Sequence, residues 1–219
     1  MNETEKLVER CKRERNAIMA ATLVTRLKGR GFDAYYCATK EEALQQAIAL
    51  IPKDHVVSWG GSVTIGQIGL QQYCREHYRC LDRDTAKTPE ERAEIMRKAL
   101  LCDTFLCSAN ALTADGEIVN IDGNGNRVAA MVYGPRQVLC IIGMQKVCKT
   151  LASALDRAHE TAATLNGRRF PDGKTPCEKT GLCFDCNVPD TMCNYVLTIR
   201  RSKPIGKIKV ILVGEEVGF

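Results

Sequence analysis

The chain has 219 residues, 45% hydrophobic and 26% charged, a composition typical of a globular protein that buries a core. Its 31 lysines and arginines outnumber 26 aspartates and glutamates, for a net charge of +5, and the basic residues are scattered along the sequence. Such dispersed charge is not typical of nucleic-acid-binding proteins, so we expect no nucleic-acid partner and, at most, a local basic site for a small anion.

The N-terminal sequence and the hydropathy bear on where the protein works. The stretch MNETEKLVERCKRERNAIM is charged and has no apolar core, so it does not resemble a signal peptide. No apolar run reaches the roughly 18 residues that a membrane helix needs. We therefore expect a cytoplasmic protein with no membrane partner, in which the twelve cysteines stay reduced.

Helix and strand patterns alternate in the first half of the chain. Residues 3–30 contain no proline and carry apolar residues at helical spacing, which predicts one long N-terminal helix. Capping boxes at Thr39 and Thr88 mark the starts of two further helices. The predicted strands around these helices are FDAYYCA, HVVSW, YRCLD and TFLCSAN. This alternation favours a largely parallel sheet covered by helices.

The second half departs from that alternation. The segment GEIVNIDGNGNRVAAMVYG has two alternating stretches around a Gly/Asn/Asp turn, which predicts a β-hairpin. A buried strand, QVLCIIG, and a helix over residues 144–166 follow, and NYVLTIRR and KIKVILVGEEV predict two final strands. Residues 171–195 form a proline- and glycine-containing loop. We predict a single α/β domain over residues 1–219, with a mostly parallel central sheet flanked by helices and a β-hairpin insertion.

Four cysteines crowd into that loop, at the spacing C-x5-C-x2-C-x6-C. They are Cys177, Cys183, Cys186 and Cys193. The central pair can present two thiolates to one metal, and the outer pair can complete a tetrahedral zinc site or an iron–sulfur cluster. A metal would also order a loop that is too polar to build its own core. We predict a metal or cluster site, and the spacing alone leaves zinc and iron–sulfur both open.

Disulfides, redox thiols and unligated thiols are less consistent with the sequence of the cysteine loop. Two disulfides would be unusual in a reducing compartment. A redox Cys-x-x-Cys pair should begin a helix after a strand, which CFDCNVP does not resemble. The eight cysteines outside the loop lie in apolar patterns, and we expect them to be small buried hydrophobic side chains. These are Cys11, Cys37, Cys74, Cys80, Cys102, Cys107, Cys140 and Cys148.

A glycine-rich turn is the main candidate for ligand binding. In VVSWGGSVTIGQIGL, Gly60, Gly61 and Ser62 lie between a buried strand and a helix. Free backbone N–H groups and the helix dipole converge at such a turn, which can bind an anion, and the hydroxyls of Ser62 and Thr64 are further donors. Tight turns also use these residues for geometry alone, and the sequence is neither a P-loop nor G-x-G-x-x-G.

Two cationic residues are candidates for the same ligand. Arg127 follows the predicted hairpin turn NIDGNGNRV and could reach an anion. Lys146 follows the strand VLCIIG, at the carboxyl end where α/β proteins often place ligand contacts. The alternative for both is an ordinary solvent-exposed charge.

Several segments together resemble the LUD-domain family, the lactate-utilisation proteins, over about residues 5–219. They are WGGSVTIGQIGL, SANALTADGEIVNIDGNGNRVAAMVYGP, VLCIIGMQKV and the terminal CEKTGLCFDC…CN. The resemblance implies an α/β fold of the ribose-5-phosphate isomerase and CoA-transferase-like superfamily. Its members bind phosphorylated sugars, CoA thioesters or folates at the loop that residues 60–64 match. The residue before Asn110 is Ala109 rather than a glutamate nucleophile, so covalent CoA transfer is not indicated.

The resemblance also bears on activity. The family's named role is lactate oxidation shared among several subunits, some of which carry iron–sulfur clusters, and this favours a 4Fe-4S cluster over zinc on the four cysteines. We therefore expect an oxidoreductase component that acts on lactate or a similar small hydroxy acid with redox partner subunits. One alternative is a protein that binds a small anionic metabolite, such as a sugar phosphate or CoA ester, or an isomerase-like protein, with a structural zinc. The other is a non-catalytic assembly subunit. No catalytic residue and no oligomeric state follow from the sequence.

Overall fold

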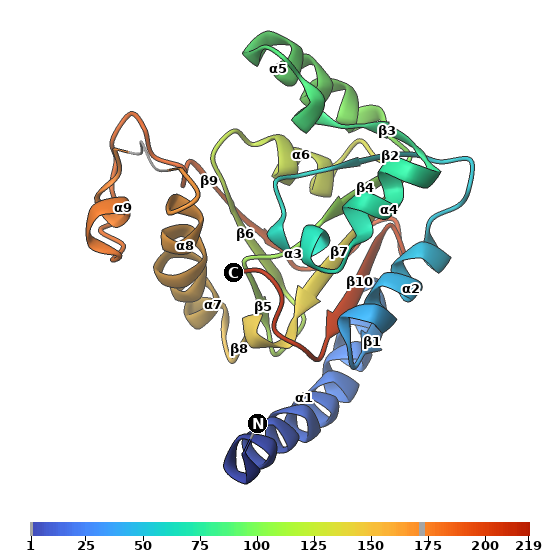
Figure 1. Cartoon of the computed structure of the whole chain (residues 1–219), viewed down its shortest axis with the longest axis vertical. Helices are drawn as coiled ribbons and strands as arrows, with labels where there is room; N and C mark the ends of the chain where they lie inside the picture. Colours follow the sequence, from blue (N-terminus) through green and yellow to red (C-terminus); the bar gives the residue numbers. More distant parts are fainter. Residues whose placement is uncertain (1, 171–173) are drawn as a thin grey trace.

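A parallel sheet forms the centre of the computed structural model, which describes residues 2–170 and 174–219 (Figure 1). Within those residues the sheet has six strands in the order β1-β10-β7-β4-β2-β3, and each neighbouring pair is parallel. The strands are β1 (Asp33–Cys37), β2 (Val56–Trp59), β3 (Arg79–Leu81), β4 (Thr104–Cys107), β7 (Gln137–Gly143) and β10 (Ile208–Val213). The predicted α/β fold is confirmed. Because the strands share one direction, the loops that follow β2, β4 and β7 meet at one edge.

A second, smaller sheet packs against the first. In the described part of the chain it has the strand order β8-β5-β6-β9. The strands are β5 (Ala111–Thr113), β6 (Ile118–Asp122), β8 (Val147–Cys148) and β9 (Tyr195–Ile199). β5 and β6 are antiparallel neighbours joined by a tight turn in which Thr113 N–H bonds Glu117 O at 2.9 Å and Gly116 has φ +89°. This β5–β6 pair is the hairpin of the fold.

The predicted position of the hairpin turn is wrong. The segment after β6 turns into a helix, α6 (Asn126–Val132), instead of a second strand. The carboxylate of Asp122 accepts the backbone N–H groups of Arg127 at 3.0 Å and Val128 at 3.1 Å, so it caps the start of that helix. Gly125 has φ +77°, a conformation that favours glycine, and it lets the chain reverse into α6.

Helices cover both faces of the six-stranded sheet. Neighbouring residues of one strand point to opposite faces. Leu139 belongs to the apolar cluster under α2, α3 and α4, whereas Val138 belongs to the cluster under α1, α6 and the second sheet. The helices are α1 (Glu3–Gly29), α2 (Lys40–Leu50), α3 (Val63–Gln67) and α4 (Leu70–His77). The outer part of α1 extends beyond the sheet, and its buried residues begin only at Ala20 (Figure 1).

The remaining helices lie around this core. α7 (Leu151–Arg157) and the π-helical η4 (Ala158–Ala163) cover the outer face of the second sheet, and α8 (Thr164–Gly167) continues from η4. The sequence predicted a helix from residue 144, but the α-helix starts later, after its cap Thr150. Before it, Met144–Lys146 form a short 3-10 helix, and β8 follows. The other elements are η1 (Arg83–Thr85), α5 (Pro89–Lys98), η2 (Ala99–Leu101) and α9 (Pro176–Thr180).

The predicted burial of the eight scattered cysteines is correct for most of them. Cys37, Cys74, Cys102, Cys107 and Cys140 are buried. Cys80 and Cys148 are half-buried, and Cys11 is exposed because it lies on the part of α1 that extends beyond the sheet.

Across residues 2–170 and 174–219, no helix has both the length and the apolar character needed to cross a membrane.

Candidate functional site

A cavity of about 650 Å³ opens at the carboxyl edge of the parallel sheet. Its lining includes every residue that the sequence suggested for ligand binding and three of the four loop cysteines. These are Gly60, Gly61, Ser62, Thr64, Arg127, Lys146, Cys177, Cys186 and Cys193. Cys183 lies outside the lining. Features more than 100 positions apart in the sequence therefore meet in one chamber.

The glycine-rich turn is shaped by two arginines. A Cβ at Gly60 would lie 3.3 Å from the side-chain carbons of Arg127, and a Cβ at Gly61 would overlap the Nη2 atom of Arg83. A side chain at either position would therefore push an arginine away from the turn. Part of the expected donor set is already in use: Gly60 N–H bonds Leu106 O at 3.2 Å, and Ser62 N–H bonds Gly60 O at 2.9 Å. The positive charge at the turn therefore comes mainly from guanidinium groups.

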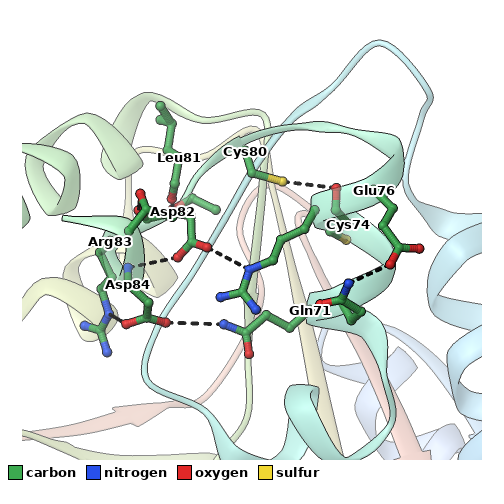
Figure 2. Close-up of polar contacts among 12 residues, drawn as sticks. Gln71, Cys74, Glu76, Cys80, Leu81, Asp82, Arg83 and Asp84 are labelled. Carbon is green, nitrogen blue, oxygen red and sulfur yellow. Dashed lines mark hydrogen bonds and ion pairs between the residues drawn. The ribbon is translucent and has the colours of Figure 1, made fainter.

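Arg83 is held in place by a network at the start of η1 (Figure 2). The Asp82 carboxylate accepts the backbone N–H of Asp84 at 2.9 Å and the Nε of Arg75 at 2.8 Å, so it fixes the turn that carries Arg83. Burial lowers the pKa of Arg83, and the nearby charge of Arg92 lowers it further. Its Nε is buried without a hydrogen-bond partner in the described chain and lies 3.8 Å from the Asp84 carboxylate.

Arg127 enters the cavity from the first turn of α6. Its Nη2 donates to Ile121 O and to the Asn110 side-chain oxygen, the latter at 3.5 Å. Its Nε lies 3.8 Å from an Asp122 oxygen and is likewise buried with no hydrogen-bond partner among the described residues. Both arginines line the cavity, and guanidinium groups bind oxyanions such as carboxylates through charge-assisted hydrogen bonds.

Cationic side chains outnumber acidic ones around the cavity. The cationic lining residues, apart from the buried Lys146, are Arg83, Arg92, Arg127 and Arg169. The acidic ones are Asp84, Asp122 and Asp190. This local excess agrees with the expected basic site for a small anion.

Lys146 is enclosed beneath the glycine-rich turn and is not a solvent-exposed charge. Its side chain is buried, with the residue only 2% exposed. Its Nζ lies 3.1 Å from Thr64 Oγ1, 3.1 Å from Ser108 Oγ and 3.3 Å from Ala109 O. Burial lowers the pKa of Lys146 to about 7, with further lowering by the charges of Arg157 and Arg127.

The segment after β10 covers this lysine. Gly218, with φ +66°, passes so close to Thr64 that a side chain there would overlap Oγ1, and its Cβ would lie 2.9 Å from Lys146 Nζ. The Gln67 side chain accepts the N–H of Gly218 at 2.6 Å, and Gln145 donates to Val217 O at 2.9 Å. These bonds hold the segment over the floor of the cavity.

Several residues of the site were missed from the sequence: Arg83, Ser108, Asn110 and Arg157. Ser108 directly follows β4, so its position at a strand carboxyl end was the available signal. Arg83 offered the same signal, because it lies two residues past the end of β3. Asn110 and Arg157 come together only in the fold, where Arg157 Nη1 donates to Asn110 O.

The loop cysteines share one neighbourhood. All four are free and half-buried, and Cys193 interacts electrostatically with Cys177, Cys183 and Cys186. Polar hydrogens surround their sulfurs, since Thr175 Oγ1 lies 3.3 Å from Cys177 Sγ and the Asp185 N–H points at Cys183 Sγ at 3.5 Å. Such hydrogen bonds are typical of metal-bound thiolates.

The donor chemistry of these cysteines fits a thiolate-ligated metal or cluster. In the described ranges, however, no three His, Cys, Asp or Glu side chains converge tightly enough to hold a metal ion. The first residues of the predicted loop, 171–173, lie outside the described residues. The loop is otherwise irregular except for α9, as the sequence predicted.

Comparisons with known proteins concern the family and the fold. A family model described as the LUD domain matches residues 20–213. A DUF162 family protein from Deinococcus radiodurans has a similar structure over 90% of this chain and 98% of its own, with a TM-score of 0.50 and 13% identity. Ribose 5 phosphate isomerase A from Neisseria gonorrhoeae matches 51% of this chain and 54% of its own, with a TM-score of 0.33 and 13% identity. A search of curated proteins gave no match. At such identity the first likeness concerns the fold alone.

Proposed function

The chain belongs to the LUD-domain family, and on that premise we propose that it is an iron–sulfur redox subunit in the oxidation of lactate or a similar small hydroxy acid. One observation carries the proposal: the cationic glycine-rich turn and three of the four loop cysteines line the same cavity. A small anion bound at the turn would therefore lie in the same chamber as a group ligated by the cysteines.

The anion is expected at Arg83 and Arg127. Both side chains line the cavity and approach Gly60 and Gly61 closely, which favours an oxyanion such as a carboxylate. Thr64 and Ser108 offer hydroxyls deeper in the cavity, where a substrate hydroxyl would find hydrogen-bond partners. In a 2-hydroxy acid such as lactate the carboxylate and the hydroxyl are on adjacent carbons, so one compact ligand would contact both the arginines and these hydroxyls.

The cluster ligands in this proposal are Cys177, Cys183, Cys186 and Cys193. A 4Fe-4S cluster held there would supply one-electron transfer. The protein's own contribution is the polar setting of the sulfurs, to which Thr175, Thr191 and the backbone of Asp185 present hydrogen-bonding groups. Oxidation of a hydroxy acid removes two electrons, so the proposal includes redox partner subunits, and it places the protein in the cytoplasm, where thiols remain reduced.

Metal content tests the proposal directly. The protein is purified without oxygen, and its iron, zinc and visible spectrum are measured. We expect about four irons per chain and a broad band at about 400 nm that bleaches on reduction. One zinc per chain without a visible band would contradict the redox function.

Cysteine variants locate the metal. Cys186→Ser should remove the iron and the band, whereas Cys11→Ser, which alters an exposed cysteine on α1, should keep both. Loss of iron in both variants, or in neither, would place the metal elsewhere.

A second function is favoured by Lys146. A buried amine near neutral pKa can take up or release a proton at physiological pH, as isomerase-like chemistry on a small anionic metabolite requires. In that case the cysteines hold a structural zinc. Zinc in place of iron, combined with saturable binding of a sugar phosphate or CoA ester at the cavity, would support this second function.

A further inference from the structure

Lys146 is a buried amine at the floor of the cavity. Its side chain leaves η3, passes under the glycine-rich turn, and ends at the floor of the cavity that it helps to line. The Gly218 segment and the end of β4 enclose it, and the residue is 2% exposed while it contributes to the lining of the cavity.

No carboxylate of the described residues hydrogen-bonds the amine. In the part of the chain that the structure describes, the hydrogen-bond partners of Nζ are two hydroxyls and one carbonyl, all neutral. The titratable groups that act on it are Arg157 from α7, Arg127 from α6 and Cys140 from β7, and the two arginines favour the uncharged amine. A structural lysine is usually paired with a carboxylate when it is buried, and this one is not.

The neighbouring hydroxyls supply proton transfer. Thr64 Oγ1 donates to Ser108 Oγ at 3.2 Å, and both lie 3.1 Å from Nζ. This triangle can deliver a proton to a carbonyl oxygen that has been attacked by the amine and can accept one from the nitrogen. The charge of Arg127 is close enough to lower the pKa of Lys146, so this arginine would hold an anionic group next to that carbonyl.

We infer that Lys146 is a nucleophile that condenses with the carbonyl group of a short 2-oxo acid held in the cavity. The Nζ lone pair attacks the carbonyl carbon and forms a C–N bond, and the resulting carbinolamine loses its oxygen as water, with the protons moved by Thr64 and Ser108. The product is an imine between Lys146 and the oxo acid, and the step needs no oxidant or reductant. The choice of a 2-oxo acid rests on the proposed function, because oxidation of a 2-hydroxy acid yields one.

Reductive trapping tests this inference. The purified protein is incubated at pH 7 with pyruvate and sodium cyanoborohydride, and the modified lysine is identified by peptide mass mapping. The reduced adduct adds the mass of pyruvic acid less one oxygen atom. We expect saturable labelling of Lys146, on the order of a hundredfold above that of an exposed lysine, because an exposed amine of ordinary pKa is almost fully protonated at this pH.

Lys149 provides the matched control. It lies three positions away in the same connection and is exposed. Lys149→Met should label like the wild type, and Lys146→Met should lose the label. Acetone, which has a carbonyl but no carboxylate, should label Lys146 at least tenfold less than pyruvate if an arginine holds the anionic group.

The pH profile separates a nucleophile from a merely structural lysine. Labelling of Lys146 should rise to a plateau just above pH 7 and change little beyond it, whereas labelling of exposed lysines should keep rising toward about pH 10. Wild-type mapping and this profile do not depend on whether Lys146→Met folds. Label spread evenly over surface lysines, or no label on Lys146 at any pH, would overturn the inference.

Iron content is measured in the same samples, so the two proposals fail separately. Label on Lys146 without iron would contradict the redox function and keep the nucleophile. Iron without label on Lys146 would keep the redox function and contradict the nucleophile.

Discussion

The two walls of the cavity differ in what keeps each of them ordered. The sheet wall, formed by Gly60, Gly61, Thr64, Ser108 and Lys146, stands on the ends of strands whose apolar residues are almost all buried. The cysteine wall, residues 174–194, buries no apolar side chain among its described residues, and its buried members, Thr175 and Glu178, are polar. Leu182 and Phe184 are 65% and 59% exposed. The sheet wall is therefore ordered by burial, whereas the cysteine wall needs ligation or a partner for the same order.

Metal removal should give the largest difference between the two walls. Stripping the metal with a chelator should raise amide hydrogen exchange in residues 174–194 by several orders of magnitude, because their protection depends on ligated thiolates. Exchange in β7 should stay unchanged, since its order comes from the core. Mass spectrometry of the two segments measures both. Equal changes in the two walls would mean that the metal supports the whole fold.

Gly61→Val should damage the sheet wall without unfolding it. The added side chain would displace the Arg83 guanidinium, and loss of its charge-assisted bond should weaken binding of L-lactate or inorganic phosphate by roughly tenfold to a hundredfold, measured by calorimetry. Gly66→Ala is the matched control, because a Cβ there lies 3.7 Å from Gln71 Oε1, an ordinary contact, and alanine favours the helix. Unchanged affinity in Gly61→Val would exclude the turn as the anion site.

Lys146 gives the sheet wall a pH-dependent stability. Its folded pKa of about 7 is below that of the unfolded chain, so between these values the unfolded state binds more protons and stability rises with pH. Relative to Lys146→Met, the free energy of unfolding of the wild type should rise from about pH 7 to about pH 10, with a slope approaching 1.4 kcal/mol per pH unit. Ionisation of the cysteines contributes to both proteins and therefore cancels in this difference. Parallel curves for the two proteins in urea titrations would show that the lysine is charged in the fold.

Arg169 links the sheet wall to α8, whose Asn166 in turn contacts Met192 of the cysteine wall, and it should have the smallest effect. Its Nη1 donates to Gly61 O at 3.2 Å and to Asn166 Oδ1 at 3.1 Å. The residue is exposed, so Arg169→Gln should cost below about 1 kcal/mol and change the anion affinity about twofold to fivefold. Arg136→Gln, which alters an exposed ion pair with Asp103, is the control and should leave affinity unchanged. A larger loss in Arg169→Gln would mean that the walls are more tightly coupled than their contacts indicate.

The sequence predicted those parts of the fold and the site that depend on residues close together in the chain. The strand–turn–helix around Gly60 was predictable because a buried strand, two glycines and the Ser62 cap all lie within a few residues. The hairpin was misplaced because DGNGN suits both a β-turn and a strand-to-helix turn, and the Asp122 cap on α6 decides between them. The burial of Lys146 could not be predicted, because its partners Thr64 and Ser108 lie 82 and 38 positions away. The meeting of the cysteines with the glycine-rich turn is a property of the fold alone.

The path of the chain after β10 has a practical consequence for the design of fusion proteins. Phe219 lines the cavity, and the residues before it are bonded to Gln67 and Gln145 over the lysine. A purification tag or fluorescent protein attached after Phe219 would be anchored at the mouth of the chamber and would compete with any ligand for that space. Asn2, by contrast, lies on the part of α1 that points away from the sheet (Figure 1). A label attached ahead of this helix would report on the molecule while leaving the chamber clear.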